Sequence, residues 1–489
     1  MATITTESER VAQKRSASRP EKRSLRAKSL FEAMATGAEK MADIVTIAIS
    51  FTVARFSYIL LHIGKNVRYS EMRIVEGSAI FAFLFVTMLT LDGGYQSGNS
   101  LLRIRETERI FRACARSFVV AMVISFCAAQ LVSRTMLLIA IILVPTFIAI
   151  EKQLLYDLLH SLHSHGHAVR RVIIYGGGTT GRRLFSALVR SPKLGLNPVA
   201  IVDDDRRLAG SDLREYSYHH ARSAEVLAGP LTADSISRLG ADMIIVAIPS
   251  VSERRLNEIA RLSVAAGTTM AVTPRLSHNS DLIASYIDVD GVLISDLQRP
   301  TPKIAYNGTK RIFDIVVTLL LLLPAAPFWL IAVILIRLDS PGPAIFKQSR
   351  VGKDGVLFEI FKFRTMRSDA PAYAAHPLEQ GDPRITRLGK WLRRTSLDEL
   401  PQLINVLRGE MSLVGPRPEM PFIVETYGYR DWQRLQVTPG LTGLWQLSAD
   451  RSFPIHTNLH YDLYYIRNRN FFMDVAVLLH TVLFAMKGV

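Results

Sequence analysis

Residues 312–336 read IFDIVVTLLLLLPAAPFWLIAVILI, and this stretch decides how the chain meets a membrane. A straight helix of that length would extend about 37 Å, which is enough to cross the hydrocarbon core of a bilayer. Pro324 and Pro327 interrupt the stretch, and prolines inside a helix kink or break it. Basic residues flank both of its ends. We therefore expect a re-entrant helix that enters and leaves the membrane on one face, with a kinked spanning helix as the alternative.

The composition of the 489-residue chain fits a membrane protein that handles anions. Its formal net charge is +16, yet 49% of its residues are hydrophobic. Soluble nucleic-acid-binding proteins are rarely so apolar, so an anionic membrane surface or phosphorylated substrates explain the charge better. We therefore expect no nucleic-acid partner. The two cysteines lie in or near apolar segments, which argues against a disulfide framework or a zinc site.

The first 151 residues predict a basic tail followed by a membrane bundle. The tail covers residues 1–40 and the bundle residues 41–151. The four apolar segments of the bundle are Ala42–Leu61, Ile74–Leu91, Ser117–Leu131 and Thr135–Ile150. Five arginines crowd the predicted loop between the second and third segments, which places that loop and the tail in the cytoplasm. A spanning helix at 312–336 would then put the C-terminal module on the opposite face, which favours re-entry.

Alternating strands and helices between residues 168 and 298 predict a Rossmann-like parallel sheet. The buried strand Val172–Tyr175 runs into a glycine-rich loop, and the next apolar strand ends at Asp203. This spacing satisfies the G-x-G-x-x-G fingerprint with an acidic residue about 20 positions later. The candidate residues of a nucleotide site are Gly176, Gly178, Gly181 and Asp203. The alternative is a structural or regulatory remnant that binds no ligand.

Two adjacent carboxylates, Asp398 and Glu399, stand C-terminal to the membrane stretch within the segment TSLDELPQ. One carboxylate can attack or accept a proton while the other holds a divalent metal, so the pair suits phosphate chemistry. Ser396 and Glu399 also satisfy the pattern of a helix capping box, which would give the pair a structural role. Both roles can coexist, because the first turn of a helix favours a carboxylate and a phosphate alike.

Cations recur on both sides of this pair. Lys362 and Arg364 alternate with apolar residues and can share one face of a strand. Arg417 stands between two prolines, whose fixed backbone would present its guanidinium to a phosphate, although a plain rigid turn is the alternative. Basic and apolar residues also mix over 384–394, as in a helix that lies at a lipid interface, although an ordinary solvated helix face is the alternative.

Five motifs carry a resemblance to a known family. They are Lys310-Arg311-x-Phe313-Asp314, Lys362-Phe363-Arg364-Thr365-Met366, Ser396-Leu397-Asp398-Glu399-Leu400-Pro401-Gln402, Gly415-Pro416-Arg417-Pro418 and Pro439-Gly440-Leu441-Thr442-Gly443. With them the chain resembles the bacterial sugar transferases, or monotopic phosphoglycosyl transferases, which move a sugar 1-phosphate from a nucleotide diphosphosugar to undecaprenyl phosphate. The whole chain is similar to their long form. That form has a membrane α-helical bundle, an α/β Rossmann-like domain and an α-rich monotopic catalytic domain, here residues 303–489 with the re-entrant helix 312–336.

The resemblance implies a two-step reaction through a phospho-aspartate. Asp398 would attack the sugar-linked phosphate and release UMP, and undecaprenyl phosphate would then take the sugar phosphate. Glu399 would ligate Mg²⁺, the implied cofactor. The implied substrate-phosphate-binding residues are Lys362, Arg364, Arg417 and Arg451. The implied lipid-interface residues are Arg393, Pro324 and Pro327. The expected donor is a UDP-sugar, UDP-glucose first and UDP-galactose second, at the start of exopolysaccharide, capsule or O-antigen assembly.

The family pattern also implies where in the cell the protein lies. It places the chain in the bacterial inner membrane with its active site facing the cytoplasm, and a homodimer is compatible with its size. The chain departs from that pattern at two points. The membrane break reads Ala326-Pro327 where the family often has Ser-Pro. The run from Gln446 to Arg451 is one residue longer than usual, so Arg451 is the least secure of the assigned cations.

Two other classes of function stay open from the residues alone. The glycine loop would also fit a membrane-bound NAD-dependent nucleotide-sugar oxidoreductase or dehydratase, and Tyr306-x-x-x-Lys310 imitates the Tyr/Lys pair of short-chain dehydrogenases. Gly308 inside that pair argues against a catalytic helix there. The other alternative is a non-enzymatic membrane scaffold, against which the intact Asp398–Glu399 pair argues.

Overall fold

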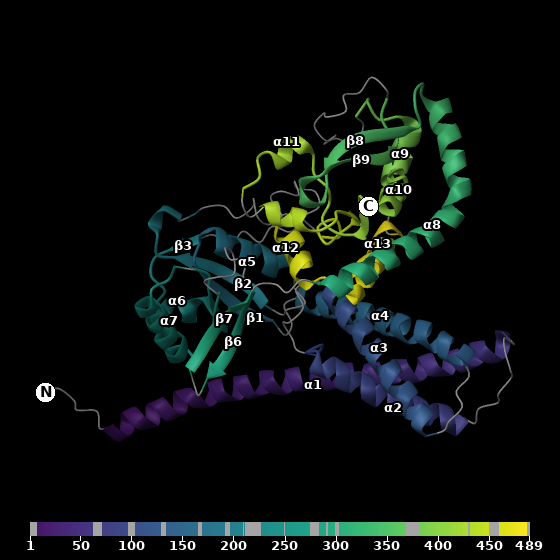
Figure 1. Ribbon diagram of the computed structural model, residues 1–489. Coiled ribbons are helices and arrows are strands. Elements are labelled where there is room, and N and C mark those ends of the chain that lie inside the picture. The colour runs from purple at the N-terminus through teal and green to yellow at the C-terminus, as the bar shows by residue number, and fades with distance from the viewer. Residues whose placement is uncertain are drawn as a thin grey trace. The chain divides into compact units, whose positions relative to one another are not determined.

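The computed structural model describes most of the chain, which Figure 1 shows as a ribbon. The described residues are 7–61, 71–95, 103–128, 134–164, 169–190, 196–208, 210, 226–248, 250–273, 283–289, 292–298, 303–367, 382–428, 431–448 and 459–486. Two compact units divide the chain, Met1–Ser280 and Asp281–Val489. The first holds a helical bundle and a parallel sheet, and the second holds a long apolar helix and a small α/β domain.

Four long helices begin the first unit, as the sequence predicts. They are α1 (Glu7–Leu61), α2 (Glu71–Leu91), α3 (Arg103–Cys127) and α4 (Arg134–Ser164). Each contains a window long and apolar enough to cross a membrane. Phe81 and Phe85 are fully buried between the helices, whereas Phe83 and Phe126 are exposed. Large exposed apolar side chains in this number mark a surface that faces lipid.

The arginine-rich stretch 103–116 is helical, whereas the sequence predicts a loop there. α3 already begins at Arg103, so the arginines occupy its first turns. Arg112 and Arg116 both pair with the carboxylate of Asp92, at 3.0 and 3.1 Å. This partner follows the end of α2 and neutralises part of the basic surface. Hydropathy cannot reveal such a partner, because it reads only one segment at a time.

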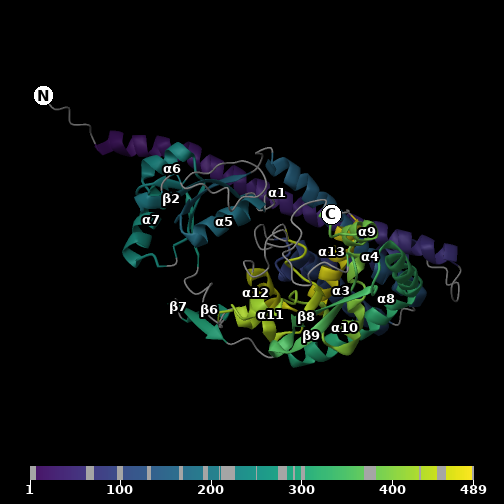
Figure 2. The same ribbon diagram turned by 90° about the horizontal axis from the view of Figure 1, so that it is seen from above.

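A five-stranded parallel sheet completes the first unit and confirms the predicted α/β sheet. Its strands are β1 (Arg170–Tyr175), β2 (Leu196–Asp203), β3 (Val226–Ala228), β4 (Met243–Val246) and β5 (Thr269–Val272), in the order β3-β2-β1-β4-β5. Its helices are α5 (Thr179–Arg190), α6 (Ala233–Leu239) and α7 (Glu253–Ala265). Phe185 of α5 packs on one face, and Ile236 of α6 and Ile259 of α7 pack on the other (Figures 1 and 2).

The second unit is built from short elements around α8. Its strands are β6 (Ile283–Val289), β7 (Val292–Gln298), β8 (Ile345–Val351), β9 (Leu357–Phe363), β10 (Ser412–Val414) and β11 (Gly440–Thr442). Its helices are α8 (Ile304–Asp339), α9 (Arg387–Arg394), α10 (Gln402–Arg408), α11 (Pro421–Val424), α12 (Leu459–Asn468) and α13 (Phe471–Met486). β6–β7 and β8–β9 are antiparallel hairpins, and β10 and β11 pair in parallel. Ala332 and Ile336 of α8 pack against Phe363 and Leu392, which joins the apolar helix to the domain.

The apolar stretch 312–336 lies inside one continuous helix, α8. The sequence predicts a break at Pro324 and Pro327, but both prolines are accommodated within the helix, whose axis bends in Figure 1. A bend relieves the clash between a proline ring and the preceding turn without ending the helix. Many apolar side chains of α8 are exposed, and Leu323, just before the first proline, is 79% exposed.

Both ends of α8 are bonded to the same globular unit. At the first end, Arg311 donates to two carbonyls in the last turn of α10, at 2.6 and 2.7 Å. At the second end, Arg364 donates to the carbonyls of Ser340 and Pro341 at 2.6 and 2.9 Å. A re-entrant helix needs such an arrangement, because both of its ends must emerge on one face. Re-entry itself stays a prediction.

We predict that Arg364→Gln lowers the midpoint of thermal unfolding of the detergent-purified protein. Arg364 is 6% exposed and also bonds the hydroxyl of Ser340, so its loss leaves several partly buried acceptors without their donor, at up to about 1–3 kcal/mol each. Lys347→Gln is the control, because Lys347 is exposed and pairs with an exposed Glu359 at 3.4 Å. An unchanged midpoint in Arg364→Gln would return this arginine to the phosphate-binding role that the sequence predicts.

Candidate active site

The two adjacent carboxylates lie on a short 3-10 turn, η5 (Leu397–Glu399), between α9 and α10. The chain enters this turn through Ser396, whose φ of 55° puts a non-glycine residue in the left-handed region. That conformation costs about 1–2 kcal/mol, and such strain collects at functional sites. The Ser396 side chain makes no capping hydrogen bond, so the capping box that the sequence allows does not form.

Glu399 is held by two cations. Lys362 Nζ, from β9, lies 2.7 Å from Glu399 Oε1, and Arg417 Nη2 lies 3.1 Å from the same oxygen. Burial by itself would raise the pKa of this carboxyl, but the charges of Lys362 and Arg417 outweigh burial and lower the pKa to about 2. Glu399 therefore stays ionised at physiological pH, which a metal ligand requires.

The pKa of Asp398 shifts in the opposite direction, upward. Burial raises its pKa, the charge of Lys362 opposes this effect, and the charge of Glu399 adds to it. Environments that push the pKa values of two neighbouring carboxyls apart assign them different roles. The geometry thus separates Asp398, a more basic group that can act as nucleophile, from Glu399, a permanent anion.

The side chains of β9 and of the residues that follow it contact three different parts of the second unit. Lys362 reaches the carboxylate pair, whereas the guanidinium bonds recorded for Arg364 all go to the end of α8. Thr365 accepts a hydrogen bond at 2.8 Å from Nε of Arg393. Burial lowers the pKa of Arg393 and the charge of Asp398 raises it, so this guanidinium lies within electrostatic reach of the candidate nucleophile.

The motifs around Arg417 and Gly440 form one structural element. β10 and β11 pair in parallel, and the amide of Gly440, at the start of β11, donates to the carbonyl of Pro416, just after β10, at 2.8 Å. A Cβ on Gly440 would lie 2.0 Å from the amide nitrogen of Gly415, so a larger residue cannot fit without a shift of the backbone. This close approach fixes the point from which the Arg417 side chain departs toward the carboxylate pair.

The motif at the start of α8 is structural. Lys310 forms an ion pair at 2.9 Å with Asp474, a buried residue of α13, and Tyr306 donates to the same carboxylate at 2.6 Å. Asp314 accepts a hydrogen bond at 2.7 Å from Ser412 of β10. These bonds tie α8 to the core of the second unit. Tyr306 and Lys310 are therefore committed to Asp474, which removes one of the two observations that favoured a dehydrogenase.

The glycine loop has the backbone of a dinucleotide-binding turn. Gly176 has a φ of 120°, a conformation that favours glycine. A Cβ on Gly181 would lie 1.8 Å from the carbonyl oxygen of Gly176, whereas a Cβ on Gly178 would meet nothing within 4 Å. These are the roles of the fingerprint glycines: a tight turn, close helix packing and room for a phosphate. Asp203 already accepts a hydrogen bond from the Gly177 amide at 2.6 Å, and the nucleotide site stays a prediction.

We predict that Gly181→Ala destabilises the first unit, whereas Gly178→Ala leaves its stability unchanged. The added methyl group collides with backbone at the first position and enters open space at the second. Overpacking of this kind costs about 1–3 kcal/mol or more. The resistance of both variants to limited proteolysis and their midpoints of thermal unfolding are measured and compared. Equal losses would contradict the packing described for this loop.

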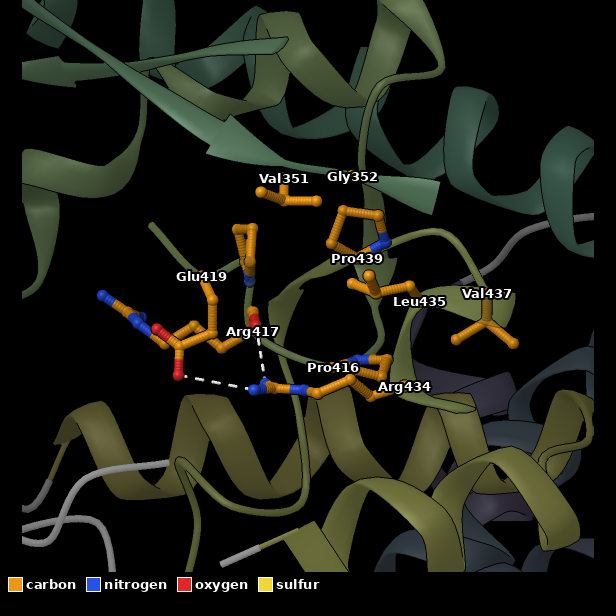
Figure 3. Close-up of a pocket in the computed structure, with 10 residues that line it drawn as sticks. Val351, Gly352, Pro416, Arg417, Glu419, Arg434, Leu435, Val437 and Pro439 are labelled. Atoms are coloured by element: carbon orange, nitrogen blue, oxygen red, sulfur yellow. Dashed lines mark hydrogen bonds and ion pairs between the residues drawn. The ribbon is translucent and has the colours of Figure 1, made fainter. Parts of the chain in front are cut away.

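Arg451 lies outside the described residues, so its phosphate-binding role stays a prediction. Arg434, which the sequence does not mark, lies behind Arg417 and donates to its carbonyl at 2.9 Å (Figure 3). Within the part of the chain that the structure describes, no group of three or more His, Cys, Asp or Glu residues could hold a metal ion. A metal here would depend on the carboxylate pair and on substrate oxygens.

Known protein families match both units of the chain. A family described as "Bacterial sugar transferase" matches residues 305–488, and one described as "CoA-binding domain" matches residues 90–264. The first match covers α8 from its second residue and every described contact of the carboxylate pair. The second covers the glycine loop and Asp203.

Several relatives resemble the chain over most of its length or over its second unit. An undecaprenyl-phosphate galactose phosphotransferase of Salmonella typhimurium is 32% identical over 367 residues, which are 70% of this chain and 72% of the relative. A UDP-glucose:undecaprenyl-phosphate glucose-1-phosphate transferase of Escherichia coli is 31% identical over 66% of this chain and 68% of its own. An enzyme of the same name from Caulobacter vibrioides is 42% identical over 37% of this chain and 72% of its own. The chain therefore belongs to the bacterial sugar transferase family.

Proposed function

We propose that the chain transfers a hexose 1-phosphate from a UDP-sugar to undecaprenyl phosphate and releases UMP, as the first step in assembling an exopolysaccharide, capsule or O-antigen. The names of the relatives support the acceptor. The observation that carries the proposal is the Glu399 carboxylate held between Lys362 and Arg417, with the half-buried Asp398 beside it. This arrangement puts a nucleophile next to two cations that can bind a diphosphate.

In the first step, a carboxylate oxygen of Asp398 attacks the phosphorus that carries the sugar. A bond forms between that oxygen and the phosphorus, the bond from the phosphorus to the bridging oxygen breaks, and UMP leaves with the electron pair. Lys362 and Arg417 are already close together, so they can bind the diphosphate oxygens with little reorganisation. Preorganised cations of this kind stabilise the charge that develops on the leaving group.

In the second step, a phosphate oxygen of undecaprenyl phosphate attacks the same phosphorus. The bond to Asp398 breaks, the carboxylate is regenerated, and the product is an undecaprenyl diphosphate sugar. We assign Arg393 to the acceptor phosphate, because it lies within electrostatic reach of Asp398. Trp391, on the same short helix, is exposed, and its ring lies 6.4 Å from that of Phe328 in α8, as expected for a helix at the lipid interface.

Mg²⁺ is the cofactor in this proposal. Mg²⁺ usually keeps several waters and is bound by one or two carboxylates together with substrate phosphates. The residues fit this requirement, because Glu399 is ionised and both of its recorded ion pairs use Oε1, which leaves Oε2 for a metal. When bound, Mg²⁺ would supply positive charge that shields the diphosphate and the departing UMP.

The proposal places the protein in the bacterial inner membrane, with the site on the cytoplasmic side. The exposed apolar surface of α8 and the anchoring of both its ends in one unit support a re-entrant position. For the donor we propose UDP-glucose, with UDP-galactose as the second candidate, since relatives named for each sugar match the chain.

We predict that Asp398→Asn abolishes UMP release, with a loss of at least about a thousandfold, because the amide cannot form the phosphoenzyme. Glu399→Gln should instead weaken the dependence on Mg²⁺ and lower the rate less severely. The measurement is UMP release by nanodisc-embedded protein with Mg²⁺, undecaprenyl phosphate and a panel of UDP-sugars.

The control for both variants is Glu359→Gln, since Glu359 is an exposed carboxylate on the same strand as Lys362. It should retain the wild-type rate. Turnover by Asp398→Asn at the wild-type rate would remove the nucleophile assignment. Lipid-dependent release with one sugar alone would name the donor, whereas well-folded protein that is silent with every donor would overturn the proposed transfer from these sugars.

A further inference from the structure

A buried ionic cluster lies next to Arg417. Its centre is Arg434 of η6 (Asp431–Gln436), which is 3% exposed. Arg434 pairs with Glu419 at 3.3 Å and with Asp462 of α12 at 2.9 Å, and these carboxylates are 6% and 3% exposed. It also donates to the hydroxyl of Tyr427. None of these four side chains touches Glu399 among the described contacts.

The same guanidinium donates to the backbone carbonyl of Arg417 at 2.9 Å (Figure 3). Figure 3 shows Arg434 bridging this carbonyl and the Glu419 carboxylate in one small pocket. The Arg417 residue is thus held from two sides. Its carbonyl bonds Arg434, while its own guanidinium lies 3.1 Å from Glu399.

The sequence of this loop explains why the carbonyl matters. Pro416 and Pro418 flank Arg417 and lack an N–H, so the backbone there offers few donors that could anchor it. The loop is anchored through its carbonyls instead. The carbonyl of Pro416 accepts from the Gly440 amide at 2.8 Å, and that of Arg417 accepts from Arg434. If the bond from Arg434 is lost, the Arg417 backbone loses the side chain that holds its carbonyl in place.

The composition of the cluster also points to positioning rather than to stability alone. Two carboxylates share one guanidinium, and burial together with Glu419 raises the pKa of Asp462 to about 6, although Arg434 opposes the shift. Apolar residues of similar volume usually stabilise a core as well as or better than such a group. A buried guanidinium, by contrast, offers five donors in a fixed plane, and these can set the direction of a neighbouring peptide.

We propose that Arg434 is a positioning residue for the transfer reaction. By fixing the Arg417 carbonyl, it aims the Arg417 guanidinium at Glu399 and at the diphosphate of the donor, and Asp462 and Glu419 hold Arg434 in that orientation. The inference rests on the proposed function, because it assigns Arg417 to the donor phosphate. Arg434 itself touches no substrate.

A double-mutant cycle tests the inference. Arg434→Lys keeps the charge but cannot bond four oxygens in one plane, so kcat/KM for UMP release should fall by about 10–100-fold. In the Arg417→Gln background the same change should cost less than about twofold, since the group that Arg434 positions is gone. Arg364→Lys is the matched control. This equally buried arginine holds the end of α8, so its effect should be the same with and without Arg417.

A second readout does not depend on turnover. In an Asp398→Asn background, the affinity for the UDP-sugar should fall with Arg434→Lys only while Arg417 is present. If Arg434→Lys does not fold, Asp462→Asn replaces it and should give a smaller loss with the same dependence on Arg417. Losses that add fully to that of Arg417→Gln, or full activity of a folded Arg434→Lys, would overturn the inference. An inactive wild type with intact, Arg417-dependent donor binding would instead overturn the proposed transfer.

Discussion

Two positive charges must stand close together to receive a diphosphate, and on their own they repel each other. In this protein Glu399 resolves the conflict. Its Oε1 lies 2.7 Å from Lys362 and 3.1 Å from Arg417, so the cations are assembled before a substrate arrives. The surrounding elements converge on this carboxylate. β9 supplies Lys362, the loop after β10 supplies Arg417, and the strained entry at Ser396 sets Asp398 beside them.

The apolar helix and the site belong to one structural system. Asp314, near the start of α8, accepts a hydrogen bond from Ser412 at the start of β10, and the loop after β10 carries Arg417. At the other end of α8, Arg364 binds the helix and is followed by Thr365, which orients Arg393. Residues of one sequence motif, such as Lys362 and Arg364, thus have different partners. Some side chains reach the carboxylate pair, and others fasten α8 to the same unit.

The sequence predicts the α/β sheet, the apolar helices and the carboxylate pair, because hydrophobic periodicity and short motifs are local signals. It does not predict which residue, far away in the sequence, a polar side chain will bond. Arg364 looked equivalent to Lys362, yet it bonds residues more than twenty positions earlier. Asp92 pairs with Arg112 in a stretch that the sequence assigns to a loop and that is helical in α3. Arg434 carries no local signal, since its role depends on three segments that meet only in the fold.

The anchoring of α8 at both ends has a consequence for how the protein responds to its lipid. A helix that spans a bilayer adjusts its tilt when the hydrocarbon layer thickens or thins. α8 has little freedom to do so, because Arg311 and Arg364 fasten its two ends to one compact unit. In the proposed re-entrant position, the bilayer would therefore adapt to the helix, and the protein itself would set the height of Asp398 relative to the lipid headgroups. Membranes of different thickness would present their lipid phosphate to the same geometry.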